Sequence, residues 1–341
     1  MMIRLPRPVL PALIALLLAA VPARGESWRA EPVKVPGGPV SAIRDSANGA
    51  HVQAGGRWLA VTPCPDTIAC FTPGKTPFLK PAPAGGLPDG FVAMRQAGEG
   101  IVEAWYANPT TAYGHGILGD AIEAATLAVR TKAGQRLTIA VGDGHVFEDL
   151  TPRLADLDGD GLNEVITVRT DVRRGAAVAV YGLVEGRLAL IASTKPIGRP
   201  NRWRNPALTI ADPTGRGRLI AEVVTPHIGG TLNLWSLEGS AARGFRLVRR
   251  TSARGFSNHA IGSRDLGLMA DAGDGLVAVP SGDRMSLRIL QVGKNGLSDR
   301  GDVKLPGRIG HALAVVGGKS APAFLTGLND GRLFLVYRQG S

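Results

Sequence analysis

Aromatic residues, cysteines and long apolar runs are all scarce in this 341-residue chain. Aromatic side chains make up 5% of the residues, which leaves few of the stacking platforms that nucleic-acid grooves use. Two cysteines cannot form a cysteine-based zinc site by themselves. After residue 25, no apolar run is long enough to cross a bilayer as a helix. These absences argue against a nucleic-acid partner and against a transmembrane segment.

The first 25 residues have the layout of a secretory signal peptide. Arg4 and Arg7 give a basic start, an apolar run follows, and small residues flank a cleavage point after Ala23 or Gly25. We therefore predict a signal peptide over 1–25 and an exported mature protein, either periplasmic or secreted. Without these residues, which hold three arginines and no acid, the balance is 36 basic against 28 acidic side chains.

The remaining excess of positive charge is mostly scattered along the chain, with short clusters such as Arg249–Arg250. Such an excess favours contact with anionic surfaces, including an anionic envelope polymer. It is also compatible with an ordinary solvated surface. Nucleic-acid binding would require a tighter basic stripe with interleaved aromatic residues, so we expect none.

The two cysteines, Cys64 and Cys70, lie six residues apart in TPCPDTIACFTP. Export to an oxidising compartment favours a disulfide between them. A redox pair would have the tighter C-x-x-C spacing, and a metal site would need further ligands nearby in the sequence. The sequence predicts a structural staple.

Short β-branched or alternating runs separated by glycine and proline predict an all-β protein. Segments with a common plan recur, and three of them are anchored by Asp156, Asp212 and Asp271; Asp120 marks a weaker copy. Such repeats are typical of β-propeller blades, which stack around a channel. We predict a single propeller domain over 26–341 with about seven blades, six being the alternative number. The N-terminal segment SWRAEPVKVP would supply the outer strand that closes the ring. A β-helix or a pair of sandwiches remains the alternative architecture.

The segment DLDGDGLNE, residues 156–164, gathers acidic side chains on alternate positions. Unpaired carboxylates so close together would repel one another, and a calcium ion removes that cost. The predicted oxygen ligands are the side chains of Asp156, Asp158, Asp160 and Glu164 and the carbonyl of Leu162. One Ca²⁺ is expected, and a metal-free solvated turn is the alternative.

This segment is not an EF-hand, because Thr167 occupies position 12 and a strand-like run VITV follows. Residues 154–169 instead resemble the calcium-binding hairpin of FG-GAP/VCBS-repeat propellers, which occur in integrin α-subunits and in exported proteobacterial proteins. The resemblance implies a propeller fold and a calcium site, and it names no substrate. Other copies of the hairpin are degraded: Arg216 and Arg218 replace acids in the second, and only Asp271 and Asp274 remain in the third.

Several polar residues fall just before the first strand of successive repeats, where a propeller would place them around one end of its channel. They are His115, Asn201, Arg202, Asn258, His259 and His311. They are predicted to form a ligand funnel, with hydrogen bonding at the blade junctions as the alternative. His51, His145 and His227 match no repeat position and receive no role.

Neither H-E-x-x-H nor G-x-S-x-G occurs, and GHGILG lacks the strand and helix of a dinucleotide site. The sequence therefore favours a non-enzymatic, calcium-binding module that holds a protein or a glycan. The rival interpretation is a polysaccharide hydrolase or lyase that uses the funnel histidines as general acid or base.

Overall fold

The computed structural model describes residues 27–339, apart from 47–48, 65–68, 78 and 319–320. The predicted signal peptide over 1–25 lies outside the described residues. All regular structure within them is β-strand, which confirms the all-β prediction. Among these residues, none forms a helix with the length and apolar character needed to span a membrane.

The strands fall into six consecutive groups along the chain. The first group is β2 (Val40–Ser46), β3 (Gly49–Ala54), β4 (Arg57–Thr62) and β5 (Cys70–Pro73). The second is β6 (Ala93–Met94), β7 (Glu99–Thr110), β8 (Glu123–Thr131) and β9 (Arg136–Ala140), followed by a short linking strand β10 (His145–Phe147). The third is β11 (Arg153–Ala155), β12 (Leu162–Asp171), β13 (Gly175–Val184) and β14 (Arg187–Ser193).

The later groups repeat the pattern. The fourth is β15 (Arg204–Ala211), β16 (Arg218–Val224), β17 (Thr231–Ser240) and β18 (Gly244–Arg254). The fifth is β19 (Ala270–Asp271), β20 (Leu276–Pro280), β21 (Ser286–Gly293) and β22 (Gly296–Lys304). The sixth is β23 (Ala314–Val316), β24 (Ala323–Gly327) and β25 (Leu333–Arg338), completed by β1 (Trp28–Val33).

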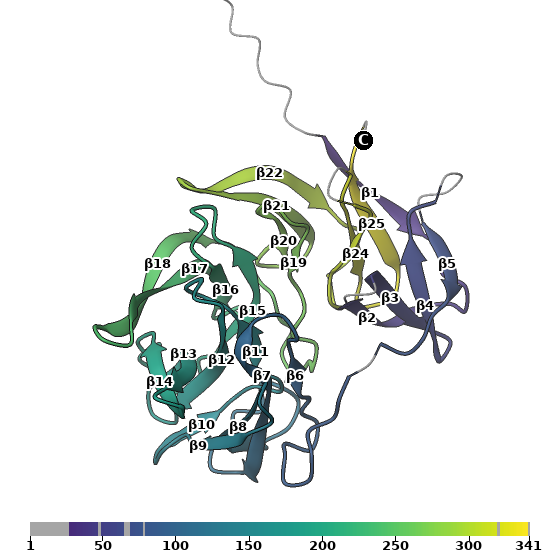
Figure 1. Cartoon of the computed structure of the whole chain (residues 1–341). Helices are drawn as coiled ribbons and strands as arrows, with labels where there is room; N and C mark the ends of the chain where they lie inside the picture. The colour runs from purple at the N-terminus through teal and green to yellow at the C-terminus, as the bar shows by residue number, and fades with distance from the viewer. Residues whose placement is uncertain (1–26, 47–48, 65–68, 78, 319–320, 340–341) are drawn as a thin grey trace, which may run out of the picture.

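Each group forms a four-stranded antiparallel blade, and the blades are arranged around a common centre (Figure 1). The second and third blades share one nine-stranded sheet, because β10 pairs with both β8 and β12. The protein is therefore a β-propeller with six blades in the described residues, the lower of the two expected numbers. The segments 90–107 and 115–131, which resemble two repeats in sequence, supply neighbouring strands of one blade.

The ring is closed in the predicted way by the N-terminal strand. β1 pairs antiparallel with β25, from Trp28 opposite Arg338 to Val33 opposite Leu333. The last blade thus combines the two ends of the described chain in a single sheet. A disulfide joins Cys64 to Cys70, as predicted, just before and at the start of β5.

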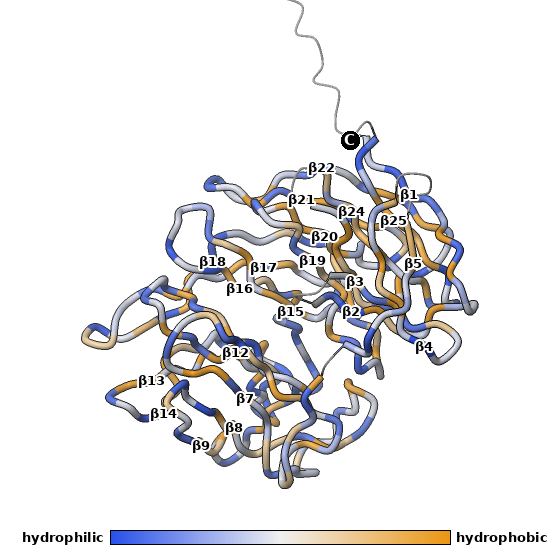
Figure 2. Tube along the Cα trace, turned by 45° about the vertical axis from the view of Figure 1, so that its right-hand side comes forward, coloured by the Kyte–Doolittle hydropathy of each residue, from blue (hydrophilic) through white to orange (hydrophobic). Residues whose placement is uncertain are grey.

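Buried apolar clusters lie between successive blades, because each sheet must cover its apolar faces against a neighbour. One such cluster joins blades two and three, and others join three to four, four to five, five to six, and six to one. In Figure 2 the apolar positions follow the strands, and hydrophilic residues gather in the connecting loops.

The junction between the first and second blades is different, and we call it the seam. In the described residues no buried apolar cluster crosses it. Residues 80–92, the strap, cover the second blade there instead and pack beside Trp105 and Ala128. Two backbone hydrogen bonds fix the strap, from the Leu87 N–H to the Tyr106 carbonyl and from the Asn108 N–H to the Gly85 carbonyl.

Antiparallel order also decides where each loop lies. Turns between the first and second strands of a blade fall at one end of the ring. The loops between second and third strands, and the connections between blades, fall at the other end. The acidic segment 156–161 belongs to the first end, and the predicted funnel residues belong to the second.

Candidate functional site

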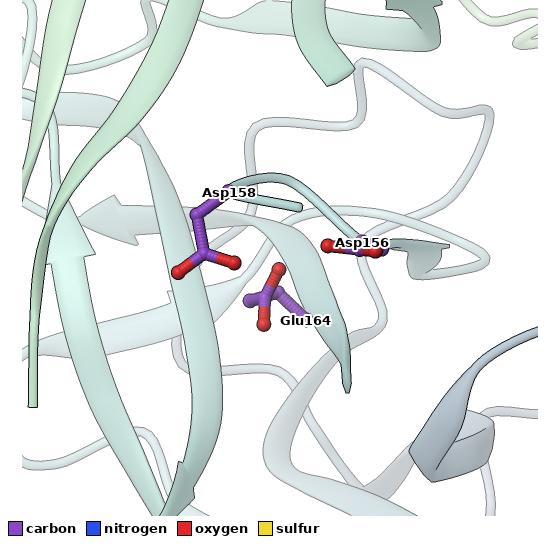
Figure 3. Close-up of side chains that lie close together, drawn as sticks. All are labelled: Asp156, Asp158 and Glu164. Carbon is purple, nitrogen blue, oxygen red and sulfur yellow. The ribbon is translucent and has the colours of Figure 1, made fainter. Parts of the chain in front are cut away.

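The acidic segment forms the turn between β11 and β12 and brings three carboxylates together (Figure 3). One ligand oxygen from each of Asp156, Asp158 and Glu164 lies within 4.8 Å of the others. Asp156 and Asp158 come from the turn, whereas Glu164 projects from the start of β12. The structure therefore assembles three of the four predicted acidic side chains.

Hydrogen bonds from the backbone hold the turn in this shape. The two carboxylate oxygens of Asp156 accept the amide hydrogens of Gly159 at 2.7 Å and Gly161 at 3.1 Å. Both glycines have positive φ, 84° and 88°, a conformation that other residues adopt at a cost. Glu164 Oε2 accepts the Leu157 amide hydrogen at 2.8 Å, which ties the second strand to the turn.

Burial makes this cluster electrostatically costly without a counter-ion. Glu164 is 5% exposed, and desolvation, followed by the charges of the neighbouring aspartates, raises its pKa to about 8. Burial and the negative charge of Asp160 also raise the pKa of Asp158. A bound cation would reverse both effects, because it favours the ionised form of each group.

The donor set fits a hard divalent cation, since its side-chain donors are carboxylate oxygens and calcium prefers oxygen ligands. Asp160 departs from the predicted set: it is exposed, it lies outside the group of three, and its Oδ1 accepts the Leu162 amide hydrogen at 2.8 Å. Leu162 begins β12, so its carbonyl belongs to the same hairpin.

The corresponding turns of the next two blades hold their acids differently. Asp212 Oδ1 accepts hydrogen bonds from the amide and the hydroxyl of Thr214, each at 2.7 Å. Arg218, where the sequence predicts loss of the metal site, extends to Asp271 of the following blade, with 3.8 Å between Nη2 and Oδ2. Neither turn forms a group of three acidic or histidine ligands among the described residues.

At the opposite end of the ring, His115 pairs with a fully buried glutamate. His115 Nδ1 lies 2.5 Å from Glu148 Oε1, and the other carboxylate oxygen accepts the Thr170 hydroxyl at 2.6 Å. The Trp203 indole donates to the Glu148 carbonyl at 2.9 Å. Burial raises the pKa of Glu148. When Glu148 is ionised, its carboxylate accepts the hydrogen on His115 Nδ1, and Nε2 of the neutral ring is then a lone pair.

A second pair of rings lies beside Trp203. His259 Nε2 is 2.8 Å from the Ser263 carbonyl, and His259 Nδ1 is 2.9 Å from His227 Nε2. The carbonyl can only accept, so Nε2 of His259 bears the hydrogen. His259 Nδ1 is then the acceptor, and His227 Nε2 donates to it. Burial lowers the pKa of His259 to about 3 and that of His227 to about 4, so both rings are neutral near pH 7.

The remaining predicted funnel residues form three kinds of contact: Asn201 joins loops of different blades, Asn258 bonds to the first strand of the fourth blade, and Arg202 bonds within its own loop. Asn258 is fully buried and donates to the Asn205 carbonyl at 3.0 Å, as Asn205 does to the Asn258 carbonyl at 3.1 Å. The Asn201 amide donates to the Tyr113 hydroxyl, and Arg202 donates to the Asn201 carbonyl. Because Asn258 and His259 are 0% exposed, they contact protein and not an open funnel.

His311 lies at a separate junction, where its amide donates to the Gly327 carbonyl. Burial lowers the pKa of its imidazole.

Sequence reasoning missed His227, Glu148 and Glu123, although VFEDL contains Glu148. Glu123 is 2% exposed, and burial, with the charges of nearby carboxylates, raises its pKa to about 10. These groups come from loops of different blades or from a strand start, so the repeat register does not align them. Only the ring brings them together.

A cavity of about 540 Å³ lies beside this polar cluster and is lined by five of the six blades and by the segment that crosses the seam. Its apolar lining includes Leu79, Phe91, Leu150, Pro152, Ala207, Leu266, Met269, Ala312 and Leu313. Charged residues of both signs complete it: Arg44, Asp45, Asp89, Arg153, Arg264 and Asp265. Arg264 pairs with Asp89, near the strap's end, and with Asp120 of the β7–β8 loop, at 3.1 and 2.9 Å.

No protein-family model matches the chain, and the search of curated proteins gives no match. Among solved structures, the WD40 domain of coronin from Toxoplasma gondii matches with a TM-score of 0.44 and 12% sequence identity. The match covers 93% of this chain and 88% of that one. The β-propeller fold described above follows from the arrangement of the sheets, and no family membership is assigned.

Proposed function

We propose that this protein is an exported, non-enzymatic binding module that holds a protein partner through a peptide segment in its central cavity. A calcium ion at the Asp156–Glu164 hairpin, of the FG-GAP/VCBS type, stiffens the ring. The single observation that carries the proposal is the cavity of about 540 Å³ beside the seam.

The cavity lining favours a peptide over a glycan. Its walls are mainly aliphatic, and Phe91 is the aromatic residue among them, whereas sugar rings usually pack against several aromatic faces. Arginines and aspartates line the same cavity, so both backbone polar groups and charged side chains of a peptide would find partners. Leu79, 41% exposed, lies where a peptide crossing the seam would pass.

Calcium is included in the proposal because it would stiffen the scaffold around the cavity. A binding loop is most precise when its scaffold does not move, and a cation satisfies the buried carboxylates of one hairpin. The disulfide between Cys64 and Cys70 suits an oxidising compartment and ties the segment that leads into the seam. Fractionation of cells that express the full chain tests export, and retention in the cytoplasm would contradict it.

The cavity is tested with short random peptides displayed on phage and selected on the purified protein in millimolar calcium. Selected peptides should lose binding to Leu79→Arg, because that substitution places a long charged side chain in the cavity. Leu190→Arg is the matched control, since Leu190 is 42% exposed on the outer strand β14. Equal binding to both variants would refute the cavity as the peptide site.

A second candidate function follows from the pairing of His115 with Glu148. A carboxylate that fixes an imidazole is the arrangement that general-base catalysis uses, and it favours a hydrolase or lyase acting on an anionic polysaccharide. Turnover of such a polymer, lost in His115→Ala but kept in His145→Ala, would establish it. Absence of turnover across a panel of anionic polysaccharides would leave the binding role.

A further inference from the structure

The outer hairpin of the fourth blade, β17–β18, carries an unusual concentration of positive charge. Between Thr231 and Arg254 the chain has five arginines and one acid, Glu238, a balance of +4. The formal charge of the whole chain is +11, so this hairpin holds more than a third of it. The arginines are Arg243, Arg246, Arg249, Arg250 and Arg254.

All five arginines are exposed, and most of their charge is not neutralised locally. Arg246 and Arg250 share the single carboxylate of Glu238, at 3.0 and 3.2 Å. The guanidinium of Arg249 lies 6.0 Å from the ring centre of Trp235. No ion pair forms at Arg243, Arg249 or Arg254 within the described part of the chain.

The arrangement is linear because β18 is the outermost strand of its sheet. Its 11 residues extend over roughly 36 Å at about 3.3 Å per residue, and the arginines mark it from its start to its end. A register shift opposite Leu234 and Trp235 leaves Arg250 unpaired in the ladder beside Arg249. Arg246 lies opposite Glu238 and Arg249 opposite Trp235, so their side chains leave opposite faces of the sheet, and the charges follow both sides of this rim strand.

A charged edge strand also prevents edge-to-edge pairing between molecules, but single charges are sufficient for that purpose. A row of uncompensated arginines of this length matches the regular negative charges of an extended polymer. The hairpin has two aromatic residues: Arg249 lies over Trp235, and Phe245 packs against the buried cluster between the third and fourth blades, so the successive exposed stacking platforms of nucleic-acid grooves are missing.

We propose that the β17–β18 hairpin binds a linear anionic polysaccharide along its row of arginines. The site is separate from the peptide cavity of about 540 Å³. Its turn, residues 239–241, lines another cavity, of about 440 Å³, together with Asp158 and Glu164 of the acidic hairpin, whereas Arg249 and Arg254 lie farther along β18. Binding is electrostatic, and it holds the propeller to a negatively charged polymer while the peptide cavity stays open.

Dextran sulfate is the probe, and uncharged dextran of similar length shows whether the charge is required. Affinity is measured over a series of salt concentrations for the wild-type chain and for the triple variant Arg243→Gln, Arg249→Gln, Arg254→Gln. The triple variant should bind about tenfold or more weakly at low salt, and its slope of log K against log salt should fall by about 2.

The matched control replaces three exposed arginines outside the hairpin, Arg57, Arg187 and Arg199, by glutamine and so lowers the net charge equally. It should retain most of the affinity. A loss equal to that of the hairpin variant would overturn the site, because net charge alone would then explain binding.

Tighter binding to single-stranded DNA than to dextran sulfate would overturn the choice of a polysaccharide. The ratio of wild-type to triple-variant affinity should be the same with calcium and with a chelator, which keeps this test distinct from the calcium proposal.

Discussion

Two hairpins at equivalent places in neighbouring blades satisfy their acidic residues in different ways. Asp156 and Asp212 each follow the first strand of a blade, and the second strand begins six residues later in both. In the third blade, further acids gather around Asp156. In the fourth, threonine and arginines replace those acids, and a hydrogen-bonded turn stands where the carboxylate cluster would be.

The substitutions are matched position by position. Thr214 stands where the first hairpin has Asp158, Arg216 replaces Asp160, and Ile220, 1% exposed, replaces Glu164. The hairpins also touch, because the Arg218 amide donates to the Leu157 carbonyl at 3.2 Å.

Arg218 then reaches forward to Asp271 of the fifth blade. The half-buried carboxylate of Asp271 is thus compensated by a guanidinium of the preceding blade, although burial still raises its pKa. The comparison teaches that one turn framework carries either a cluster of carboxylates or an arginine that pairs with the next blade. Within the described residues, no lysine, arginine or histidine forms an ion pair with the three clustered acids of the first turn.

Removal of calcium should produce the largest difference between the two hairpins. A ligand at about 100 times its Kd stabilises the folded form by about 2.7 kcal/mol, so a chelator should lower the free energy of unfolding by that order. Asp158→Ala should abolish the shift, whereas Thr214→Ala at the equivalent position should keep it. Thermal unfolding of the three proteins, with calcium and with chelator, measures this.

In chelator alone, Asp158→Ala should be at least as stable as the wild type, since it removes a repelling charge. A calcium shift that survives in Asp158→Ala, or that disappears in Thr214→Ala, would break the proposed contrast.

The pH dependence of the metal-free protein should reveal Glu164, which has no counterpart at Ile220. Its folded-state pKa of about 8 exceeds the ordinary 4.5, so the folded form holds the proton more tightly. The contribution of protonated Glu164 to the free energy of unfolding is fully present below pH 4.5. It declines as pH rises toward 8, by roughly 2 kcal/mol between pH 5 and 7. Urea unfolding in chelator should show this decline, and Glu164→Gln should remove it.

Calcium should reverse the slope of the free energy of unfolding against pH. The ion binds the ionised carboxylate, so the stability that calcium adds is lost as pH falls. The exposed Glu185→Gln is the control and should leave the metal-free slope unchanged. If Glu164→Gln and Glu185→Gln behaved alike, Glu164 would not be the titrating group.

The ion pair between Arg218 and Asp271 should contribute a smaller coupling energy, and that energy should not depend on calcium. The side chains of Arg218 and Asp271 are 31% and 20% exposed, which reduces the interaction through solvent screening. A double-mutant cycle with Arg218→Met and Asp271→Asn should give a coupling of about 1 kcal/mol. The coupling energy should be equal with calcium and with chelator. A coupling near zero, or one that changes with calcium, would refute the proposal that Arg218 compensates the charge of Asp271 without a metal ion.

Local pattern was sufficient to predict the strands and the closure of the ring. Runs such as NEVITVRTD and AAVAVYGL form β12 and β13 because each is apolar on both faces and bounded by turn residues. The N-terminal segment pairs with β25 because the last repeat lacks an outer strand. The acidic turn was also predictable, since its spacing alone brings Asp156 and Asp158 together.

Features that depend on packing between blades were not predictable in the same way. The number of blades was overestimated as about seven because residues 90–107 and 115–131 look like two repeats, yet β7 and β8 are neighbours in one sheet. His227 matches no repeat position, but a loop of the fourth blade brings it to His259. The cavity likewise forms where loops of several blades meet the segment that crosses the seam, which no residue pattern signals.

The smallest expected effect belongs to Asp160, the predicted ligand that the structure leaves outside the group of three. Its carboxylate is exposed and accepts the Leu162 amide hydrogen, a bond that an asparagine side-chain oxygen can also accept. Asp160→Asn should therefore change the metal-free stability by less than about 0.5 kcal/mol. It should also reduce the calcium-induced shift in unfolding temperature less than Asp158→Asn does. Calorimetric titration of calcium into both variants ranks the two residues, and an equal loss of affinity would mean that Asp160 turns inward when the ion binds.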